Sequence, residues 1–156
     1  MDEKDEARDV TVDMQELTVN LSPDASHIYA THYYKCKLDF TPPDDYFSPI
    51  PYFLLCRAIE LEIKARHLKR LTQEEVKKFG HRLLKAYEAL DAQEQILSQN
   101  ELAVLKTADE LYQDTDFAYF NPLHAHPFTA YSKFPDLIML DSIAKKLIDS
   151  GSTTWE

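Results

Sequence analysis

Residues 52–68 carry apolar side chains at almost every position of a predicted helix. The apolar positions fall into two stripes at helical spacing, Tyr52, Leu55, Cys56, Ile59 and Ile63 in one and Leu54, Ala58, Leu61, Ala65 and Leu68 in the other. Arg57, Glu60 and Lys64, each about one turn apart, leave a narrow polar strip. A helix that is apolar nearly all round is surrounded by other elements. We therefore predict that this segment is the central helix of a bundle.

Start signals and apolar periodicity predict further helices around it. The first helix begins at Ser22–Pro23, with serine as N-cap and proline at the first helical position. Its apolar face is formed by Ala25, Ile28, Tyr29, His32, Tyr33 and Cys36. Thr72 and Glu75 have the spacing of a capping box, and the helix that they open should break or weaken at Gly80. Ser98 caps the next helix.

The last helix opens at Pro135–Asp136 and is expected to stop at Gly151. The fold class that follows is all-α, a single-domain bundle of about five helices over residues 22–150. Residues 1–21 are interpreted as an acidic arm with a short extended stretch, and 151–156 as a C-terminal tail. The chain has two glycines where average usage of about 7% would give roughly eleven, which favours helices over hairpins.

Charge narrows the choice of partners. Lys and Arg number 17 and Asp and Glu 27, a formal net charge of −10. An acidic chain repels phosphate backbones, so RNA binding is disfavoured as a general activity. A basic stretch between Lys64 and Lys85 is interpreted as solvated helix faces with i,i+4 pairs such as Glu60–Lys64 and Glu62–Arg66, rather than as a functional patch.

The sequence also indicates the cellular compartment in which the protein is found. Cys36 and Cys56 have no metal-binding spacing, and we expect both to be buried, reduced thiols. The N-terminal run MDEKDEARD has no apolar stretch typical of a signal peptide. No window reaches the length of a membrane span. We therefore expect a cytoplasmic protein with no membrane partner.

Two motifs give a family resemblance. The run AIELEIKARHLKR (58–70), followed after a charged spacer by FGHRLLKAYEAL (79–90), resembles the HEPN superfamily. The family's central helix often reads A-x-E-x-x-L-K-A and its next helix starts G-H-D-L. The matching residues are Ala58, Glu60, Lys64 and Ala65, then Gly80, His81 and Leu83, with Arg82 where Asp is usual. The resemblance covers roughly residues 50–150.

The resemblance implies a helical bundle that is usually dimeric, and many relatives are RNases of toxin–antitoxin, phage-defence or RNA-processing systems. Those enzymes use an Arg followed a turn or two later by a His, the pair supplying charge stabilisation and proton transfer. None of the five arginines here is followed by a His at that interval. The nearest counterpart, FNPLHAH (120–126), has Phe120 at the Arg position. The nuclease site of the family is therefore expected to be missing.

Several residues remain as site candidates. His81, Arg57, Glu60 and Arg82 are the candidate ligand-binding residues. His81 at a helix start is interpreted as a cap or a ligand contact, and Arg57 with Glu60 as an internal salt bridge or a retained site. His124 and His126, with Asp114 and Asp116, are weak candidates for a metal site. The aromatic segment 114–134 either stacks against a ligand or closes the bundle or a dimer interface.

The hypothesis favoured by these observations is a non-catalytic HEPN-like interaction module. It would form a homodimer through an apolar helix face and bind a protein partner, or RNA or a nucleotide, without a cofactor. The alternative is a divergent RNase using His81 or His124 with Arg57 or Arg82. A weaker alternative is a metal-dependent hydrolase that uses the loop of His124 and His126.

Overall fold

The computed structural model describes residues 22–113 and 134–152, and within them every regular element is helical. The elements are α1 (Pro23–Asp39), α2 (Ile50–His67), α3 (Gln73–Lys77), α4 (Leu83–Glu88), the 3₁₀ turn η1 (Ala92–Glu94), α5 (Gln99–Gln113) and α6 (Leu137–Ser152). The predicted all-α class is confirmed. The extended stretch proposed for the N-terminal arm lies outside the described residues, as do most of the C-terminal tail and segment 114–133.

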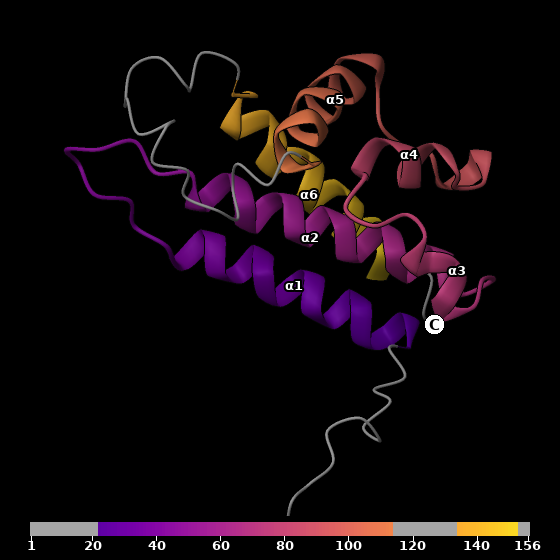
Figure 1. The fold of residues 1–156 in the computed structure, drawn as a ribbon. Coiled ribbons are helices and arrows are strands. Elements are labelled where there is room, and N and C mark those ends of the chain that lie inside the picture. Colours follow the sequence, from indigo (N-terminus) through magenta and orange to yellow (C-terminus); the bar gives the residue numbers. More distant parts are fainter. Residues whose placement is uncertain (1–21, 114–133, 153–156) are drawn as a thin grey trace, which may run out of the picture.

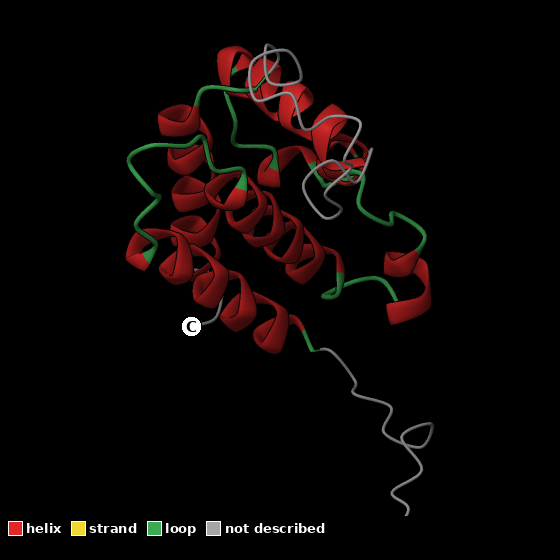
Figure 2. Cartoon of the chain, turned by 60° about the vertical axis from the view of Figure 1, so that its left-hand side comes forward, coloured by secondary structure: helices red, strands yellow, loops and turns green. Residues whose placement is uncertain are grey.

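Helix α2 is the central element of the bundle, as predicted. It packs against α1, α4, α5 and α6, and Figure 1 shows it between α1 and the other helices. Figure 2 shows the all-helical bundle from another side. Leu55, Ile59 and Ile63 of α2 are fully buried in the main hydrophobic core. Ala58 and Ala65, which belong to the second apolar stripe of α2, are fully buried as well. A single helix thus shares its surface with four neighbours, which explains why both of its apolar stripes are needed.

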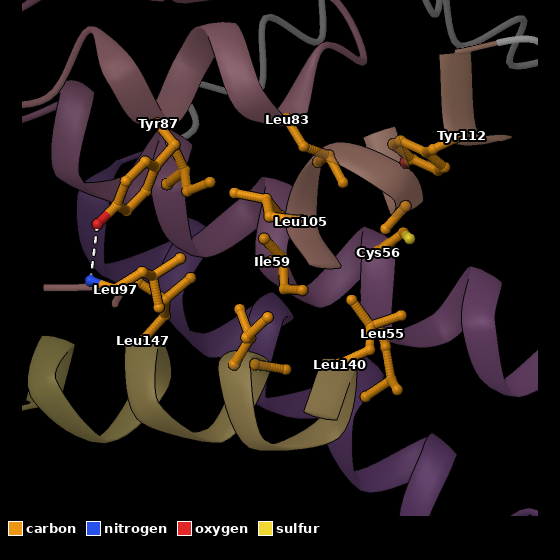
Figure 3. Packing of buried hydrophobic residues seen from close by; sticks show 14 of the residues in the cluster. Leu55, Cys56, Ile59, Leu83, Tyr87, Leu97, Leu105, Tyr112, Leu140 and Leu147 are labelled. Atoms are coloured by element: carbon orange, nitrogen blue, oxygen red, sulfur yellow. Dashed lines mark hydrogen bonds between the residues drawn. The ribbon is translucent and has the colours of Figure 1, made fainter. Parts of the chain in front are cut away.

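The main core lies between α2, α4, α5 and α6 (Figure 3). Its largest fully buried side chains include Leu55, Ile59, Leu105, Leu140 and Leu147. Tyr87 is almost completely buried as well, and its hydroxyl accepts a 2.8 Å hydrogen bond from the Leu97 amide, so the polar end of the ring is satisfied.

Most of the predicted start signals are confirmed. Ser22 accepts a hydrogen bond from the amide three residues on (3.1 Å), as Thr72 does in its capping box with Glu75 (3.3 Å). Ser98 and Asp136 do the same at the starts of α5 and α6 (3.3 and 2.9 Å). The predicted interruption at Gly80 is also confirmed. Its φ of 57° lies in the left-handed region, which glycine adopts freely, and the chain turns there between α3 and α4.

The packing of α1 differs from the prediction. The helix contacts α2 through its smallest side chains, because Ser26 and Ala30 are fully buried and the Ser26 hydroxyl donates to the Leu61 carbonyl at 2.7 Å. Small residues at the contact let two helices approach closely. As a result Ile28 and Tyr29 of the predicted apolar face point outward, at 49% and 45% exposed, whereas Tyr33 of that face is half-buried and packs against a small cluster that includes Ala30.

The prediction that both cysteines are buried is therefore wrong for one of them. Cys36 lies on the outward face of α1 and is exposed, whereas Cys56 is fully buried in the core, where burial raises the pKa of its thiol. The cause is the rotation of α1 about its axis, which is set by Ser26 and Ala30 rather than by the larger apolar residues.

The expected stop of the last helix at Gly151 is also wrong, since α6 continues to Ser152. Gly151 is needed for packing instead. A Cβ placed there would lie 2.0 Å from Glu62 Oε1 on α2, so any larger residue requires that buried carboxylate to shift. Within the described residues, no helix combines the length and the apolarity that crossing a bilayer requires.

Candidate functional site

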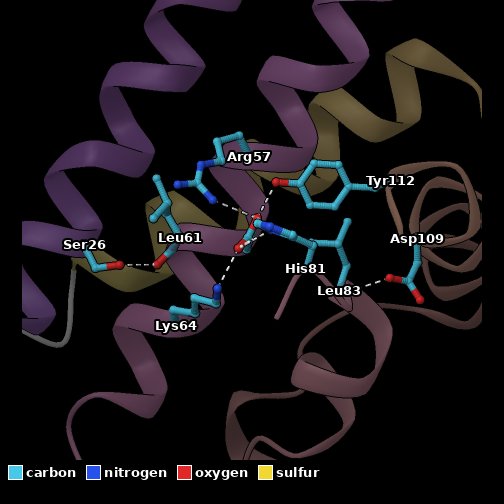
Figure 4. A network of polar contacts seen from close by, with 9 residues as sticks. Ser26, Arg57, Leu61, Lys64, His81, Leu83, Asp109 and Tyr112 are labelled. Atoms are coloured by element: carbon cyan, nitrogen blue, oxygen red, sulfur yellow. Dashed lines mark hydrogen bonds and ion pairs between the residues drawn. The ribbon is translucent and has the colours of Figure 1, made fainter. Parts of the chain in front are cut away.

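Glu60 is a buried carboxylate at the centre of a polar cluster inside the bundle (Figure 4). Its side chain is 3% exposed and has four partners. Arg57 Nη1 donates to Oε2 at 3.1 Å and Lys64 Nζ donates to Oε1 at 2.6 Å. His81 Nδ1 lies 3.1 Å from Oε1 and 3.2 Å from Oε2, and the Tyr112 hydroxyl donates to Oε2. We call these five residues the Glu60 cluster.

Helix geometry brings the first two partners to Glu60. Arg57 is three residues before it on α2 and Lys64 four residues after it, which are the spacings of neighbouring side chains on a helix surface. Arg57 also lies over the ring of Tyr33 from α1, with its guanidinium carbon 5.9 Å from the ring centroid. Arg57 and Lys64, the two cations of the polar strip on α2, are therefore both directed at the Glu60 carboxylate.

His81 and Tyr112 come from elements far along the chain. Tyr112 is in the last turn of α5 and His81 is in the turn between α3 and α4. That turn is held in place by Asp109 of α5, whose carboxylate accepts the Leu83 amide at 2.6 Å (Figure 4). Arg82, the N-cap residue of α4, makes no side-chain capping bond, so Asp109 caps this helix from a neighbouring one. The His81 ring packs edge-on against Tyr112, with centroids 5.6 Å apart.

The electrostatics keep Glu60 ionised. Burial by itself would raise the pKa of Glu60, but the hydrogen bonds and charges of Lys64, Tyr112 and Arg57 outweigh burial and leave that pKa below its usual value. Burial and the adjacent Glu60 charge raise the pKa of Tyr112. Burial disfavours the charged form of Arg57, yet the Glu60 charge more than reverses this and raises the Arg57 pKa. The cluster is therefore an anion held by a hydroxyl and fixed cations.

Chemically, the cluster joins three elements through one carboxylate. Both oxygens of Glu60 are occupied by donors, so it is an anchor for α2, α5 and the turn before α4 rather than a free base. His81 is the most exposed member, at 61% of its side chain. Its Nδ1 faces Glu60, and its Nε2 has no hydrogen-bond partner among the described residues. His81 is therefore the member of the cluster that is most accessible to a ligand.

The structure brings together three of the four ligand-binding candidates. Arg57, Glu60 and His81 meet in the cluster, whereas Arg82 is exposed and lies outside it. Tyr112 was missed by the sequence reasoning. Its place on the apolar stripe of α5 pointed to the core, and no local signal relates that stripe to a residue 52 positions earlier.

The metal candidates His124, His126, Asp114 and Asp116 lie outside the described residues. The hydrolase alternative that depends on them therefore stays an untested prediction. Across residues 22–113 and 134–152, no group of three or more His, Cys, Asp or Glu side chains is arranged to hold a metal ion.

The basic stretch is largely used within the fold. The predicted pair Glu60–Lys64 is confirmed, but the pair Glu62–Arg66 is not formed as a hydrogen-bonded contact. Arg66 is buried and donates instead to the Leu147 carbonyl (2.8 Å) and to Ser150 Oγ (2.6 Å) near the end of α6. Arg70 pairs with two acidic residues, Asp91 and Glu94.

Glu62 is a second buried carboxylate, with a different environment. Its Oε2 lies 2.7 Å from His27 Nδ1 of α1, and its Oε1 has no hydrogen-bond partner. Burial raises the pKa of Glu62, and the nearby His27 only partly opposes the shift. The two carboxylates of α2 therefore differ in their electrostatic environment. The surroundings of Glu60 stabilise its anion, whereas those of Glu62 do not.

Comparison with known protein families, curated proteins and solved structures finds no match for this chain. The HEPN resemblance accordingly stands on its sequence motifs alone and remains a prediction.

Proposed function

We propose that the protein is a non-catalytic HEPN-like interaction module that forms a homodimer through the outer face of α1. We define this outer α1 face by Ile28, Tyr29, His32 and Cys36, all of which are exposed. The observation that carries the proposal is that α1 leaves Ile28 and Tyr29 exposed while its small residues Ser26 and Ala30 are fully buried. We further propose a cytoplasmic location, which the two unpaired cysteines support.

The outer α1 face has the spacing of a contact surface. Residues 28, 29, 32 and 36 fall on one stripe of the helix, at intervals of one, three and four positions. Scattered single apolar residues are normal on a protein surface, but a rimmed apolar stripe is typical of an interaction site. Lys35 and Asp39 lie seven residues after Ile28 and His32, so they continue the same side of the helix, where they form an exposed ion pair at 3.4 Å.

A second copy is the partner that this face fits. A two-fold interface places the same surface on both sides, so the surface must complement itself. The charges on this side of α1, Lys35 and Asp39, are of opposite sign and pair with each other. This matters because two chains of net charge −10 repel each other, and a neutral contact minimises that repulsion.

The Glu60 cluster supports the non-catalytic part of the proposal. Arg57 and Lys64 already share one carboxylate, so their charge is partly neutralised before any phosphate arrives. An enzyme that stabilises a phosphorane-like transition state needs donors directed at the developing charge. The cations of this cluster are directed at Glu60 instead.

The divergent-RNase alternative has one specific observation in its favour. His81 presents Nε2 outward while Glu60 contacts its Nδ1, which is how a carboxylate orients an imidazole for proton transfer. Incubation of the purified chain with structured and single-stranded RNA, with and without EDTA, tests this alternative. Cleavage that is lost in His81→Ala and kept in His32→Ala would establish the enzyme and contradict the non-catalytic proposal.

Sedimentation velocity over a range of protein concentrations tests the homodimer. We expect a dimer that is strengthened by added salt, because salt screens the repulsion of two acidic chains. Ile28→Asp should give a monomer with an unchanged helical circular dichroism spectrum. Ile138→Asp is the matched control, because Ile138 is 83% exposed on α6 and is not one of the residues of the outer α1 face.

The cysteines provide a second readout of the same contact. Cys36 is exposed and Cys56 is buried, so a thiol reagent applied to the folded chain labels Cys36. Labelling of Cys36 should slow as protein concentration rises, and Ile28→Asp should abolish that dependence. A wild-type chain that sediments as a monomer at all concentrations, with a constant labelling rate, would contradict the proposed dimer.

A further inference from the structure

Beside the Glu60 cluster, α2 and α3 enclose a cleft of about 140 Å³. Its lining residues come from one stripe of α2 and from the short helix that folds back on it. They are Arg57, Leu61, Lys64, Leu68, Gln73, Val76 and Lys77. None of the residues of the outer α1 face lines the cleft, so the inference drawn from it is independent of the proposed dimer.

The charged lining of the cleft is positive. Arg57, Lys64 and Lys77 contribute three cations, and the carboxylate in contact with the first two is Glu60. Lys77 has no ion-pair partner among the described residues. One negative charge thus faces three positive charges, in a chain whose net charge is −10. A local positive region in an acidic protein attracts small anions in preference to other solutes.

The remaining wall is apolar. Leu61 and Val76 are buried side chains that form one side of the cleft, and Leu68 extends it. A bare inorganic anion would leave these surfaces wet, whereas an aliphatic chain would cover them. The ligand chemistry that matches both walls is one anionic group attached to a short hydrocarbon.

The volume limits the size of that hydrocarbon. A cavity of about 150 Å³ in an apolar core holds one benzene molecule. The cleft is of similar size, so it accommodates a ligand of about six heavy atoms and is well below the roughly 300–1,000 Å³ of sites for drug-sized ligands.

We propose that this cleft binds a short aliphatic carboxylate, with the carboxylate between Arg57, Lys64 and Lys77 and the hydrocarbon against Leu61, Leu68 and Val76. Arg57 and Lys64 share their charge with Glu60, so the donor that remains for the ligand carboxylate is mainly the Lys77 ammonium. The same chemistry exists in two sources, a free short-chain acid and the C-terminal residue of a peptide that ends in an aliphatic side chain.

Isothermal titration calorimetry with acetate, butyrate and pentanoate tests the site. Each added methylene should strengthen binding about fourfold, because each buries more apolar surface. Pentanamide, which has the same shape without the charge, should bind at least tenfold more weakly than pentanoate. Absence of saturable heat with pentanoate, or equal affinity for acetate and pentanoate, would overturn the proposal.

Variants separate the cleft from general charge effects. Lys77→Ala should weaken pentanoate binding several-fold, while Lys78→Ala, which removes the adjacent exposed lysine outside the cleft, should leave it unchanged. Both side chains are exposed, so circular dichroism should show the wild-type fold in each. Equal losses in the two variants, or no loss in Lys77→Ala, would contradict the assignment.

Two further ligands identify the source of the carboxylate. A short peptide ending in a free leucine should bind, and its C-terminal amide should not. Tighter binding of the peptide than of pentanoate would assign the cleft to the chain end of a protein partner, and tighter binding of pentanoate would assign it to a free acid. If butyl phosphate binds more tightly than both, the proposed carboxylate chemistry is wrong.

Discussion

Replacement of Glu60 by glutamine is the most direct perturbation of the site. The side chain keeps its size but loses its negative charge, and one of its two oxygens becomes an amide nitrogen. The four donors that surround Glu60, from Arg57, Lys64, His81 and Tyr112, then meet a single acceptor and an additional donor.

The expected cost follows from the burial of the cluster. Removing one partner of a buried ion pair leaves uncompensated charge in a poorly solvated place, which typically costs about 3–5 kcal/mol. Arg57 and Lys64 are partly exposed and can turn toward water, so we expect the lower end of that range, about 3 kcal/mol. That would be a large share of the roughly 5–15 kcal/mol by which a domain is normally stable.

Urea unfolding followed by circular dichroism measures this difference. Glu60→Gln should lower the midpoint while the slope of the free energy of unfolding against urea stays unchanged. Glu74→Gln is the control, because this glutamate is exposed on α3 and its replacement should change stability by less than about 0.5 kcal/mol.

The pH dependence supplies an independent check. The folded state holds the pKa of Glu60 below its unfolded value of about 4.3, so its contribution to stability is complete above that value. It is lost as pH falls through the lower, folded pKa. The stability gap between wild type and Glu60→Gln should therefore be constant near neutrality and close in acid. A Glu60→Gln chain that is as stable as wild type at pH 7 would refute this account of the cluster.

Three further predictions concern the rest of the bundle. Glu62→Gln should cost less than about 1.5 kcal/mol at pH 7 in urea unfolding, because burial raises the Glu62 pKa and the ionised form is already disfavoured; a loss larger than that of Glu60→Gln would contradict this. Gly151→Ala should lower stability by about 1–3 kcal/mol in thermal unfolding, because its Cβ would lie 2.0 Å from Glu62 Oε1; an unchanged melting temperature would disprove this packing. Leu105→Ala should cost about 2–5 kcal/mol, against less than about 0.5 kcal/mol for Ile138→Ala, since the first is fully buried and the second exposed; similar losses would place the core elsewhere.

Local signals predicted much of the architecture. The central position of α2 follows from its two apolar stripes, because such a helix leaves no side that water can cover favourably. The starts of the helices follow from Ser, Thr and Asp residues that satisfy nearby backbone amides. The turn at Gly80 follows from the conformational freedom of one glycine.

Part of the candidate site was also within reach of the sequence. Arg57, Glu60 and Lys64 stand on one strip of one helix, so their mutual contacts depend only on helical spacing. His81 was singled out for its position at a helix start, but its contact with Glu60 depends on how α3 and α4 fold back on α2.

Only the tertiary structure decided which helix faces meet. The predicted apolar face of α1 does not meet the core as one stripe, because Ser26 and Ala30 pack against α2 and leave Ile28 and Tyr29 outside. Tyr112 and Asp109 become partners of Glu60 and Leu83 through the register of α5 against its neighbours. Periodicity along a helix fixes which residues share a face, whereas the choice and register of the facing helix depend on side-chain shapes that are distant in the chain.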